Sequence, residues 1–174
     1  MKMEVDIKVK KNQDLTGQEL EDIITLCSKA FNEDFHPYMK DFIGGTHILG
    51  YYEDTLVSHA LWLDRWVRIE NKPLLETAFL DAVAVDEKNR KRGFGSSILT
   101  RLAGEITDYD IAALTTGSPD FYKRLGWKAW MGPVYFQRVN GHTTSLNNST
   151  LMILTLPKTT DLYLNTPLTV EWRE

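Results

Sequence analysis

The feature that most constrains the fold is a change of hydrophobic period between residues 74 and 107. The segment LLETAFLDAVAV, residues 74 to 85, is apolar on both faces, which predicts a central strand. The polar stretch DEKNRKRGFG follows, and residues 96 to 107 then place apolar side chains on one helical face, at Ile98, Leu99, Leu102 and Ile106. A buried strand that passes through a glycine turn into an amphipathic helix predicts an α/β fold.

The remaining segments alternate between strand and helix signals. Two helix starts are marked, one by a capping box of Thr16 and Glu19 and one by Ser118 ahead of Pro119. Residues 32 to 45 are typical of an irregular or partly helical loop. Further strands are predicted over residues 3–10, 46–52, 56–68, 111–116, 127–136, 151–156 and 168–172. This order predicts an α/β (α+β) fold with a mixed, largely antiparallel twisted sheet flanked by helices.

The composition fits a single globular domain over residues 1–174, with 43% hydrophobic and 25% charged residues. The net charge of −4 argues against a nucleic-acid partner and favours a cationic or small neutral one. Cys27 is the only cysteine, so no internal disulfide is expected and a reducing compartment is favoured. The sequence shows no signal-peptide pattern and no apolar run of roughly 20 residues. We therefore expect a cytoplasmic protein without a membrane partner, and leave a homodimer open.

The turn between the central strand and its helix is the most informative motif. Glycine lets the backbone approach a ligand, and the N–H groups at a helix start carry partial positive charge, which together suit a pyrophosphate. The alternative is a glycine turn with merely solvated basic side chains. We favour the phosphate site because strand, turn and helix agree. A P-loop and a dinucleotide fingerprint are excluded, because the first needs Gly-Lys-Ser/Thr and the second a third glycine. The motif consists of Arg90, Lys91, Arg92, Gly93, Phe94 and Gly95.

Two stretches together resemble the signatures of GNAT N-acetyltransferases, namely Arg90-x-x-Gly93-x-Gly95 after the strand at 80–85 and Phe121-Tyr122-x-x-Leu125-Gly126-Trp127. The resemblance implies a GNAT-like fold and acetyl-CoA as cosubstrate. In that family, amides of the glycine turn hold the acetyl-CoA pyrophosphate, and the preceding strand pairs with the pantetheine arm. The implied pantetheine contacts are Val83, Ala84 and Val85, and the implied pyrophosphate contacts are Arg90, Lys91, Arg92, Gly93, Phe94 and Gly95.

Within that family, the chain resembles aminoglycoside 2′-N-acetyltransferases nearly end to end. The stretches that carry this resemblance include Ala30-Phe31-x-x-Asp34-Phe35, Gly44-Gly45-x-His47, Phe79-x-Asp81-x-Val83, Leu114-Thr115-Thr116 and Glu171-Trp172-Arg173. It implies acetylation of an aminoglycoside and, with it, antibiotic resistance. Those enzymes carry a glutamate where Asp81 stands, and their chains run a few residues past the Trp-Arg pair, whereas this chain stops at Glu174.

Acetyl transfer to an amine needs a base for the ammonium proton and an acid for the departing thiolate. Asp81 is the candidate base, through a water, because strand alternation puts it on one face with Val83. Its structural alternative is an ion pair with Arg65 or Arg68. Tyr122 is the candidate acid, because the family places a tyrosine here against the sulfur of CoA. Its alternative is a core aromatic residue.

The acceptor residues follow from the charge of an amine-bearing substrate. Carboxylates attract and orient a cation, threonines can hydrogen-bond sugar hydroxyls, and an indole can cover a sugar face. Each of these residues also has an ordinary alternative as a surface charge, a strand end or a core aromatic. The candidates are Asp34, Asp81, Thr115, Thr116, Trp172 and Glu174.

Three hypotheses remain open on the sequence. The first is an acetyltransferase of aminoglycoside 2′ type, and the second is a GNAT enzyme for a polyamine, a peptide N-terminus or another amine. The third is a GNAT-like domain that binds acyl-CoA as a sensor and does not turn over. No metal is expected in any of them, because the histidines show no ligand spacing with one another or with Cys27. These histidines are His36, His47, His59 and His142.

Overall fold

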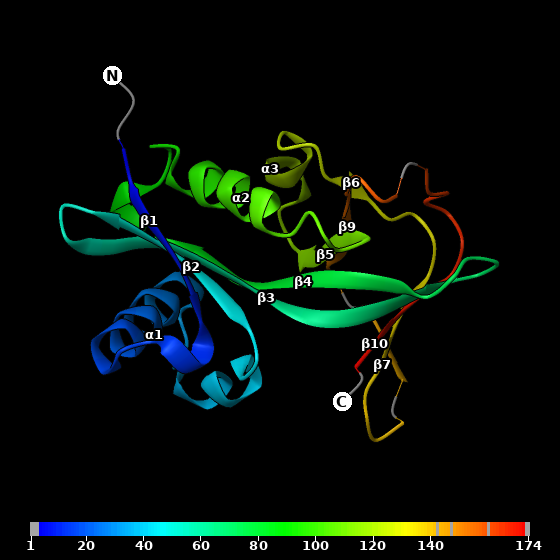
Figure 1. Ribbon diagram of the computed structural model, residues 1–174, viewed down its shortest axis with the longest axis horizontal. Helices are drawn as coiled ribbons and strands as arrows, with labels where there is room; N and C mark the ends of the chain where they lie inside the picture. Colours follow the sequence, from blue (N-terminus) through cyan, green and yellow to red (C-terminus); the bar gives the residue numbers. More distant parts are fainter. Residues whose placement is uncertain (1–3, 142, 147, 160, 173–174) are drawn as a thin grey trace. The chain divides into compact units, whose positions relative to one another are not determined.

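The computed structural model describes residues 4–141, 143–146, 148–159 and 161–172, and its chain divides into two compact units. The first unit comprises Met1–Leu63 and Leu80–Glu105, and the second comprises Asp64–Phe79 and Ile106–Glu174. Two long strands, β3 (Thr55–Ile69) and β4 (Leu75–Val85), each contribute one part to each unit (Figure 1). Both units are therefore discontinuous in sequence.

Helices lie on both faces of an antiparallel sheet in the first unit. Besides its parts of β3 and β4, this unit contains β1 (Asp6–Lys11), η1 (Asn12–Asp14), α1 (Gly17–Phe31), η2 (His36–Phe42), β2 (Thr46–Tyr52), η3 (Glu87–Asn89) and α2 (Phe94–Glu105). β2 pairs with both β1 and β3. Leu49 of β2 packs in the cluster that contains α1, whereas the neighbouring Gly50 faces Ile98 of α2. Because successive strand residues point to opposite faces, α1 and α2 cover opposite sides of β2 (Figure 1).

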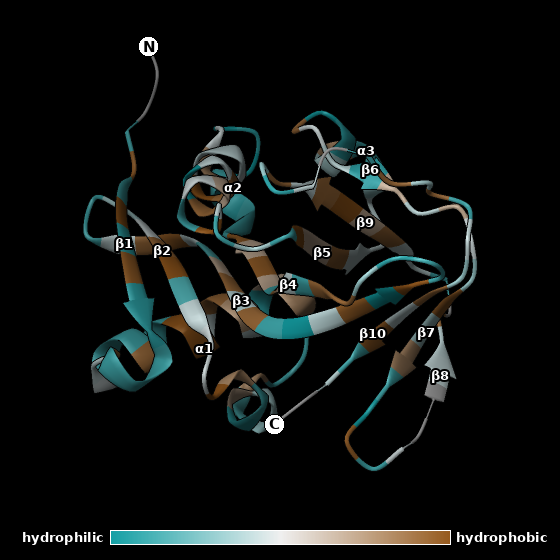
Figure 2. Ribbon diagram, turned by 45° about the vertical axis from the view of Figure 1, so that its right-hand side comes forward, coloured by the Kyte–Doolittle hydropathy of each residue, from teal (hydrophilic) through white to brown (hydrophobic). Residues whose placement is uncertain are grey.

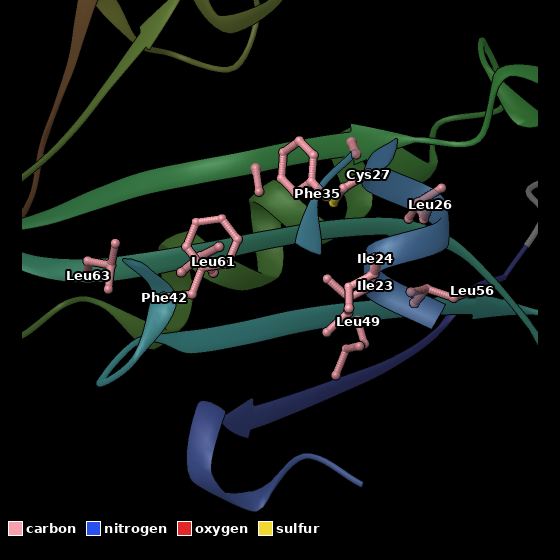
Figure 3. Close-up of a cluster of buried hydrophobic side chains, with 12 residues drawn as sticks. Ile23, Ile24, Leu26, Cys27, Phe35, Phe42, Leu49, Leu56, Leu61 and Leu63 are labelled. Atoms are coloured by element: carbon pink, nitrogen blue, oxygen red, sulfur yellow. The ribbon is translucent and has the colours of Figure 1, made fainter. Parts of the chain in front are cut away.

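The apolar core of the first unit lies between α1, η2 and the sheet (Figure 3). Ile23 and Cys27 of α1 are fully buried, and so are Leu49 of β2 and Leu61 of β3. A fully buried aliphatic side chain of this size contributes about 2 kcal/mol. The apolar residues of α1 thus form one stripe that faces the sheet.

The predicted capping box at the start of α1 is confirmed. The Glu19 N–H donates to Thr16 Oγ1 at 3.1 Å, and the Thr16 N–H donates to Glu19 Oε1 at 2.9 Å. Lys10 also donates to Glu19 Oε1, at 2.7 Å, so the cap is tied to β1. The helix ends at Phe31, because Asn32 adopts the left-handed conformation at its C-cap.

The second unit is a mixed sheet with hydrogen-bonded order β6-β9-β5-β4-β3-β10-β7-β8. β5 runs parallel to β4, and β7 runs parallel to β10, whereas β10 and β3, β5 and β9, β6 and β9, and β7 and β8 pair antiparallel. β9 is apolar along most of its length (Figure 2) and packs into the core with Ile111, Trp130 and Val170. Its new elements are β5 (Ile111–Thr116), α3 (Pro119–Lys123), β6 (Lys128–Ala129), β7 (Val134–Gln137), β8 (Thr143–Ser145), β9 (Thr150–Thr155) and β10 (Leu168–Glu171). The predicted mixed, largely antiparallel sheet flanked by helices is confirmed.

The prediction of one strand over residues 127–136 is wrong. The segment forms β6 and β7 with a break between them, where the N–H groups of Met131 and Gly132 both donate to the Leu164 carbonyl. A Cβ at Gly132 would overlap the Thr166 carbonyl, so only glycine allows this close approach. Sequence analysis also missed β8, a three-residue strand that pairs with β7.

Candidate active site

β4 carries an irregularity at Ala82, whose φ of 48° lies in the left-handed region that residues with a Cβ avoid. The Ala82 N–H donates to the Asp81 carboxylate at 2.6 Å, and the Ala82 carbonyl lies 2.8 Å from His59 Nδ1. Burial follows the predicted alternation, because Ala82 is buried, Asp81 is exposed and Val83 is half-buried. Asp81 and Val83 therefore lie on the more exposed side of β4. Ala84 is buried and Val85 is half-buried, which continues the pattern.

The turn after β4 presents a row of free backbone donors. Lys91 and Gly93 both have positive φ, 66° and 83°. Within the described residues, no protein hydrogen bond is donated by the backbone N–H groups of residues 91 to 96, which lead into the first turn of α2. Arg90, Lys91 and Arg92 are exposed, and Arg92 donates to Asn89 Oδ1 at 3.0 Å. The candidate pyrophosphate residues of the sequence thus form an electropositive turn that is exposed at residues 90–93, and α2 begins with the buried Phe94 and Gly95.

Asp34 lies in the first unit, just before η2, and is exposed. Its Oδ1 lies 2.6 Å from His36 Nδ1 and accepts the His36 N–H at 3.1 Å. The hydrogen bonds from His36 lower the pKa of Asp34, and the same carboxylate raises the pKa of His36. Beside them, the rings of Phe35 and Tyr38 lie 5.0 Å apart. The carboxylate of Asp34 therefore stays charged at neutral pH.

Tyr122 lies in α3 of the second unit and is 7% exposed. Burial raises the pKa of its phenol to about 12, so the proton stays on the oxygen at neutral pH. The ring packs edge-on against Phe121 and Trp127, at 5.1 and 6.1 Å between centroids. Its hydroxyl makes no hydrogen bond to any described residue. The phenol is therefore protonated and has no hydrogen-bond partner in the described part of the chain.

Thr115 and Thr116 lie at the end of β5, where Thr115 is exposed and Thr116 Oγ1 accepts the Ser118 N–H at 2.9 Å. The second hydroxyl therefore supports the turn into α3. Trp172 lies under two cations, with the guanidinium carbons of Arg65 and Arg138 at 4.8 and 5.2 Å from its ring centre.

The neighbouring Glu171 is buried, and its carboxylate accepts from Arg68 Nε at 2.8 Å. This carboxylate therefore serves an ion pair of the second unit. Glu174, the last acceptor candidate, lies outside the described residues.

Sequence reasoning missed a buried pair of histidines in the first unit. His47 Nδ1 and His59 Nε2 lie 2.9 Å apart, and both side chains are fully buried. Their position on the apolar faces of β2 and β3 was the available signal, because a buried imidazole needs a partner. Among the described residues, no three His, Cys, Asp or Glu side chains are grouped so that they could hold a metal ion.

Residues 12–130 match the family model described as an acetyltransferase (GNAT) domain, which is more than half of the chain. The chain belongs to the GNAT acetyltransferase family. Members of this family use acetyl-CoA to acetylate small amine substrates. No helix in the described part of the chain has the length and apolar character that a membrane crossing requires.

Solved structures of GNAT proteins share the fold. One is a GNAT family N-acetyltransferase from Escherichia coli, YhbS, in complex with CoA, with 16% identity, a TM-score of 0.68 and coverage of 98% of this chain and 91% of that protein. Escherichia coli ElaA shows 19% identity and a TM-score of 0.62 over 86% of this chain and 99% of that protein. A GCN5-related N-acetyltransferase from Kribbella flavida shows 20% identity and a TM-score of 0.61, over 72% of this chain and 34% of that longer protein.

Proposed function

We propose that residues 1–174 act as one GNAT domain that transfers the acetyl group of acetyl-CoA to a primary amine of a small acceptor. The observation that carries this proposal is the row of N–H donors at residues 91–96, which have no acceptor among the described residues and lie at the start of α2 in a GNAT chain. These amides and the basic side chains of Arg90, Lys91 and Arg92 would bind the pyrophosphate. The half-exposed side of β4, with Val83 and Val85, would contact the pantetheine arm.

In this reaction the acceptor nitrogen attacks the thioester carbonyl carbon, so that a C–N bond forms and the C–S bond breaks. We assign the ammonium proton to Asp81, through a water, and the proton for the CoA thiolate to Tyr122. Asp81 is exposed, and Tyr122 keeps its proton because burial raises its pKa to about 12. Asp81→Asn, which retains an oxygen for the Ala82 N–H, should lower kcat by about 100-fold.

Two isosteric substitutions at Gly93 test the pyrophosphate site. A Cβ at Gly93 meets no atom within 4 Å, and asparagine tolerates positive φ, so Gly93→Asn should fold and bind CoA. Gly93→Asp has the same shape with a negative charge, and should weaken CoA binding by about tenfold or more relative to Gly93→Asn. Titration calorimetry with CoA measures both constants. Gly104→Asp, in open space on α2, is the control, and equal CoA affinity of Gly93→Asp and Gly93→Asn would overturn the site.

For the acceptor, we propose a small cationic amine, of which an aminoglycoside acetylated at its 2′ amine is the first candidate. The resemblance to aminoglycoside 2′-N-acetyltransferases and the exposed carboxylates of Asp34 and Asp81 support it. Thr115, with an exposed side chain on β5, and Glu174 remain proposed contacts. Trp172 fits this role less well, because Arg65 and Arg138 lie over its ring and repel a polycation.

A second candidate acceptor is an amine that also bears an anionic group, such as a peptide N-terminus with acidic side chains, which the cations around Trp172 favour. Thiol release from acetyl-CoA, measured with aminoglycosides, polyamines and peptides in parallel, separates these classes. Turnover with the peptide alone would displace the aminoglycoside, and CoA binding without turnover on any amine would indicate a sensor. The cytoplasmic location stays a prediction, and the homodimer stays open and is tested by light scattering.

A further inference from the structure

A continuous row of polar side chains runs through the interior of the first unit to the irregular residue of β4. Asn12 Oδ1 lies 2.8 Å from His47 Nε2, His47 Nδ1 lies 2.9 Å from His59 Nε2, and His59 Nδ1 lies 2.8 Å from the Ala82 carbonyl oxygen. Asn12, in η1, is half-buried, whereas both imidazoles are fully buried. None of these groups belongs to the acetyl-transfer roles assigned above, so the row needs an explanation of its own.

The carbonyl at the inner end fixes where each proton lies. Because the Ala82 carbonyl can only accept, His59 Nδ1 must carry a proton. A neutral His59 then offers a lone pair at Nε2, which must accept from a proton on His47 Nδ1. A neutral His47 offers its lone pair at Nε2, so the group of Asn12 that faces it must be the NH₂. The oxygen and nitrogen of an amide exchange places by a half-turn of the side chain, and we place the Asn12 nitrogen towards His47.

The surroundings keep both rings neutral. Burial, together with the neighbouring imidazole, lowers the pKa of His47 to about 3, and burial lowers the pKa of His59 to about 4 despite the Ala82 carbonyl. From α1, the Cys27 sulfur lies 3.8 Å from His59 Nδ1, and burial followed by the charge of Asp81 raises the pKa of that thiol to about 12. Among the described residues, no other titratable side chain pairs with either ring. Neutral rings require the single proton order given above.

The peptide between Ala82 and Val83 connects this row to the reaction. The bond is trans and planar, so the Val83 N–H points opposite to the Ala82 carbonyl. The carbonyl points to His59, which is buried in the first unit, and the N–H therefore points away from that core. Val83 also lies on the half-exposed side of β4 to which the pantetheine arm is assigned. The direction of the carbonyl thus sets the direction of a donor on the ligand side.

We propose that His59 is a positioning residue for acetyl transfer: it holds the Ala82 carbonyl inward so that the Val83 N–H faces the thioester carbonyl, and His47 and Asn12 fix the tautomer that allows this. The role of the Val83 N–H rests on the proposed acetyl-CoA function. The order of protons along Asn12, His47 and His59 is independent of that function. A donor aimed at the developing oxyanion acts mainly on the transition state. His59 should therefore affect kcat more than the binding of acetyl-CoA.

The proton order is measurable in the unmodified protein. Nitrogen-15 spectra of the histidine rings, assigned with His47→Gln, should show His47 and His59 as neutral rings protonated at Nδ1 from pH 5 to pH 8. A proton on His59 Nε2 with a bare Nδ1, or a doubly protonated ring at pH 6, would overturn the row. This measurement needs no acceptor and no turnover, so its failure is distinct from failure of the proposed function.

The positioning role is tested by two replacements of His59. Asparagine can still donate to the Ala82 carbonyl from nearly the same place as Nδ1, whereas leucine of similar size cannot. His59→Leu should lower kcat by about 10- to 100-fold with little change in KM for acetyl-CoA, and His59→Asn should recover most of the loss. Equal loss in both variants, with CoA binding intact in each, would assign His59 to packing alone.

A spectroscopic measurement keeps the proposal testable if His59→Leu does not fold. The Val83 amide proton should shift further downfield with acetyl-CoA than with CoA in the unmodified protein, because only the thioester supplies a carbonyl acceptor. The same difference should persist in His59→Asn. An identical Val83 shift with the two ligands would show that this N–H does not meet the thioester, and would refute the proposal.

Discussion

At the scale of single residues, Tyr122 is the sharpest test of the chemistry. Its hydroxyl makes no hydrogen bond to a described residue, so Tyr122→Phe should leave folding intact. If the phenol protonates the CoA thiolate, kcat should fall by about 100-fold or more while CoA affinity stays the same. Steady-state kinetics measure kcat, and calorimetry measures CoA affinity. The matched control is Tyr163→Phe, because Tyr163 is 79% exposed. Full activity in Tyr122→Phe would remove it from the mechanism.

The buried histidine pair also predicts a pH dependence of stability. The folded protein keeps His47 and His59 neutral, whereas the unfolded chain binds protons below its ordinary pKa of 6.5. Unfolding therefore takes up protons, and the free energy of unfolding should fall as pH drops from 6.5 towards 4, by about 1 kcal/mol per pH unit for each histidine. Urea titrations along this range measure the slope. The slope of the unfolding free energy against pH should be about halved in His47→Gln and unchanged in the exposed His36→Gln. An unfolding free energy that does not change between pH 6.5 and 4 would contradict the burial of the pair.

At the scale of elements, the cap of α1 makes the clearest prediction. Thr16→Ala removes the acceptor for the Glu19 N–H and should lower the free energy of unfolding by about 1 kcal/mol, whereas the exposed Thr25→Ala should not lower it. Urea unfolding measures both values.

The carboxylate of the same cap predicts a pH dependence. Burial raises the pKa of Glu19, but hydrogen bonds from Lys10 and Thr16 outweigh it and lower that pKa below 4.5. The stabilisation by Glu19 is thus present above pH 4.5 and is lost as pH falls through the folded pKa. The free energy of unfolding, measured with urea, should accordingly differ between Glu19→Gln and the unmodified protein more at pH 7 than at pH 3.

Elements that depend on local signals could be predicted from the sequence, and those that depend on distant contacts could not. The α1 cap, β5 and the glycine turn follow from spacing within a few residues. The break between β6 and β7 depends on the Leu164 carbonyl, some thirty residues away, so the apolar run at 127–136 gave no sign of it. The histidine row is of the same kind, because it needs the pairing of β2 with β3 to bring His47 beside His59.

At the scale of the whole molecule, the proposed cosubstrate should stabilise the fold. A ligand that binds only the folded protein adds about 2.7 kcal/mol at 100 times its Kd, which is about 5 to 10 °C in Tm for a chain of this size. Scanning calorimetry with CoA should show this rise. Gly93→Asp should lose about half of it or more at the same CoA concentration, while Gly104→Asp should keep it. A Tm unaffected by saturating CoA would count against the binding site rather than against the fold.

The division of β3 and β4 between the two units has a consequence for how the chain is synthesised. The first unit needs Met1–Leu63 and Leu80–Glu105, and the intervening Asp64–Phe79 belongs to the second. On the ribosome, the first unit therefore has all its residues once Glu105 emerges, whereas residues 64–79 must wait for the strands encoded after Ile106. The order of translation therefore separates the two folding events. In nascent chains arrested shortly after residue 105, the sheet of the first unit would be complete, but residues 64–79 would not yet be paired with β5 and β10.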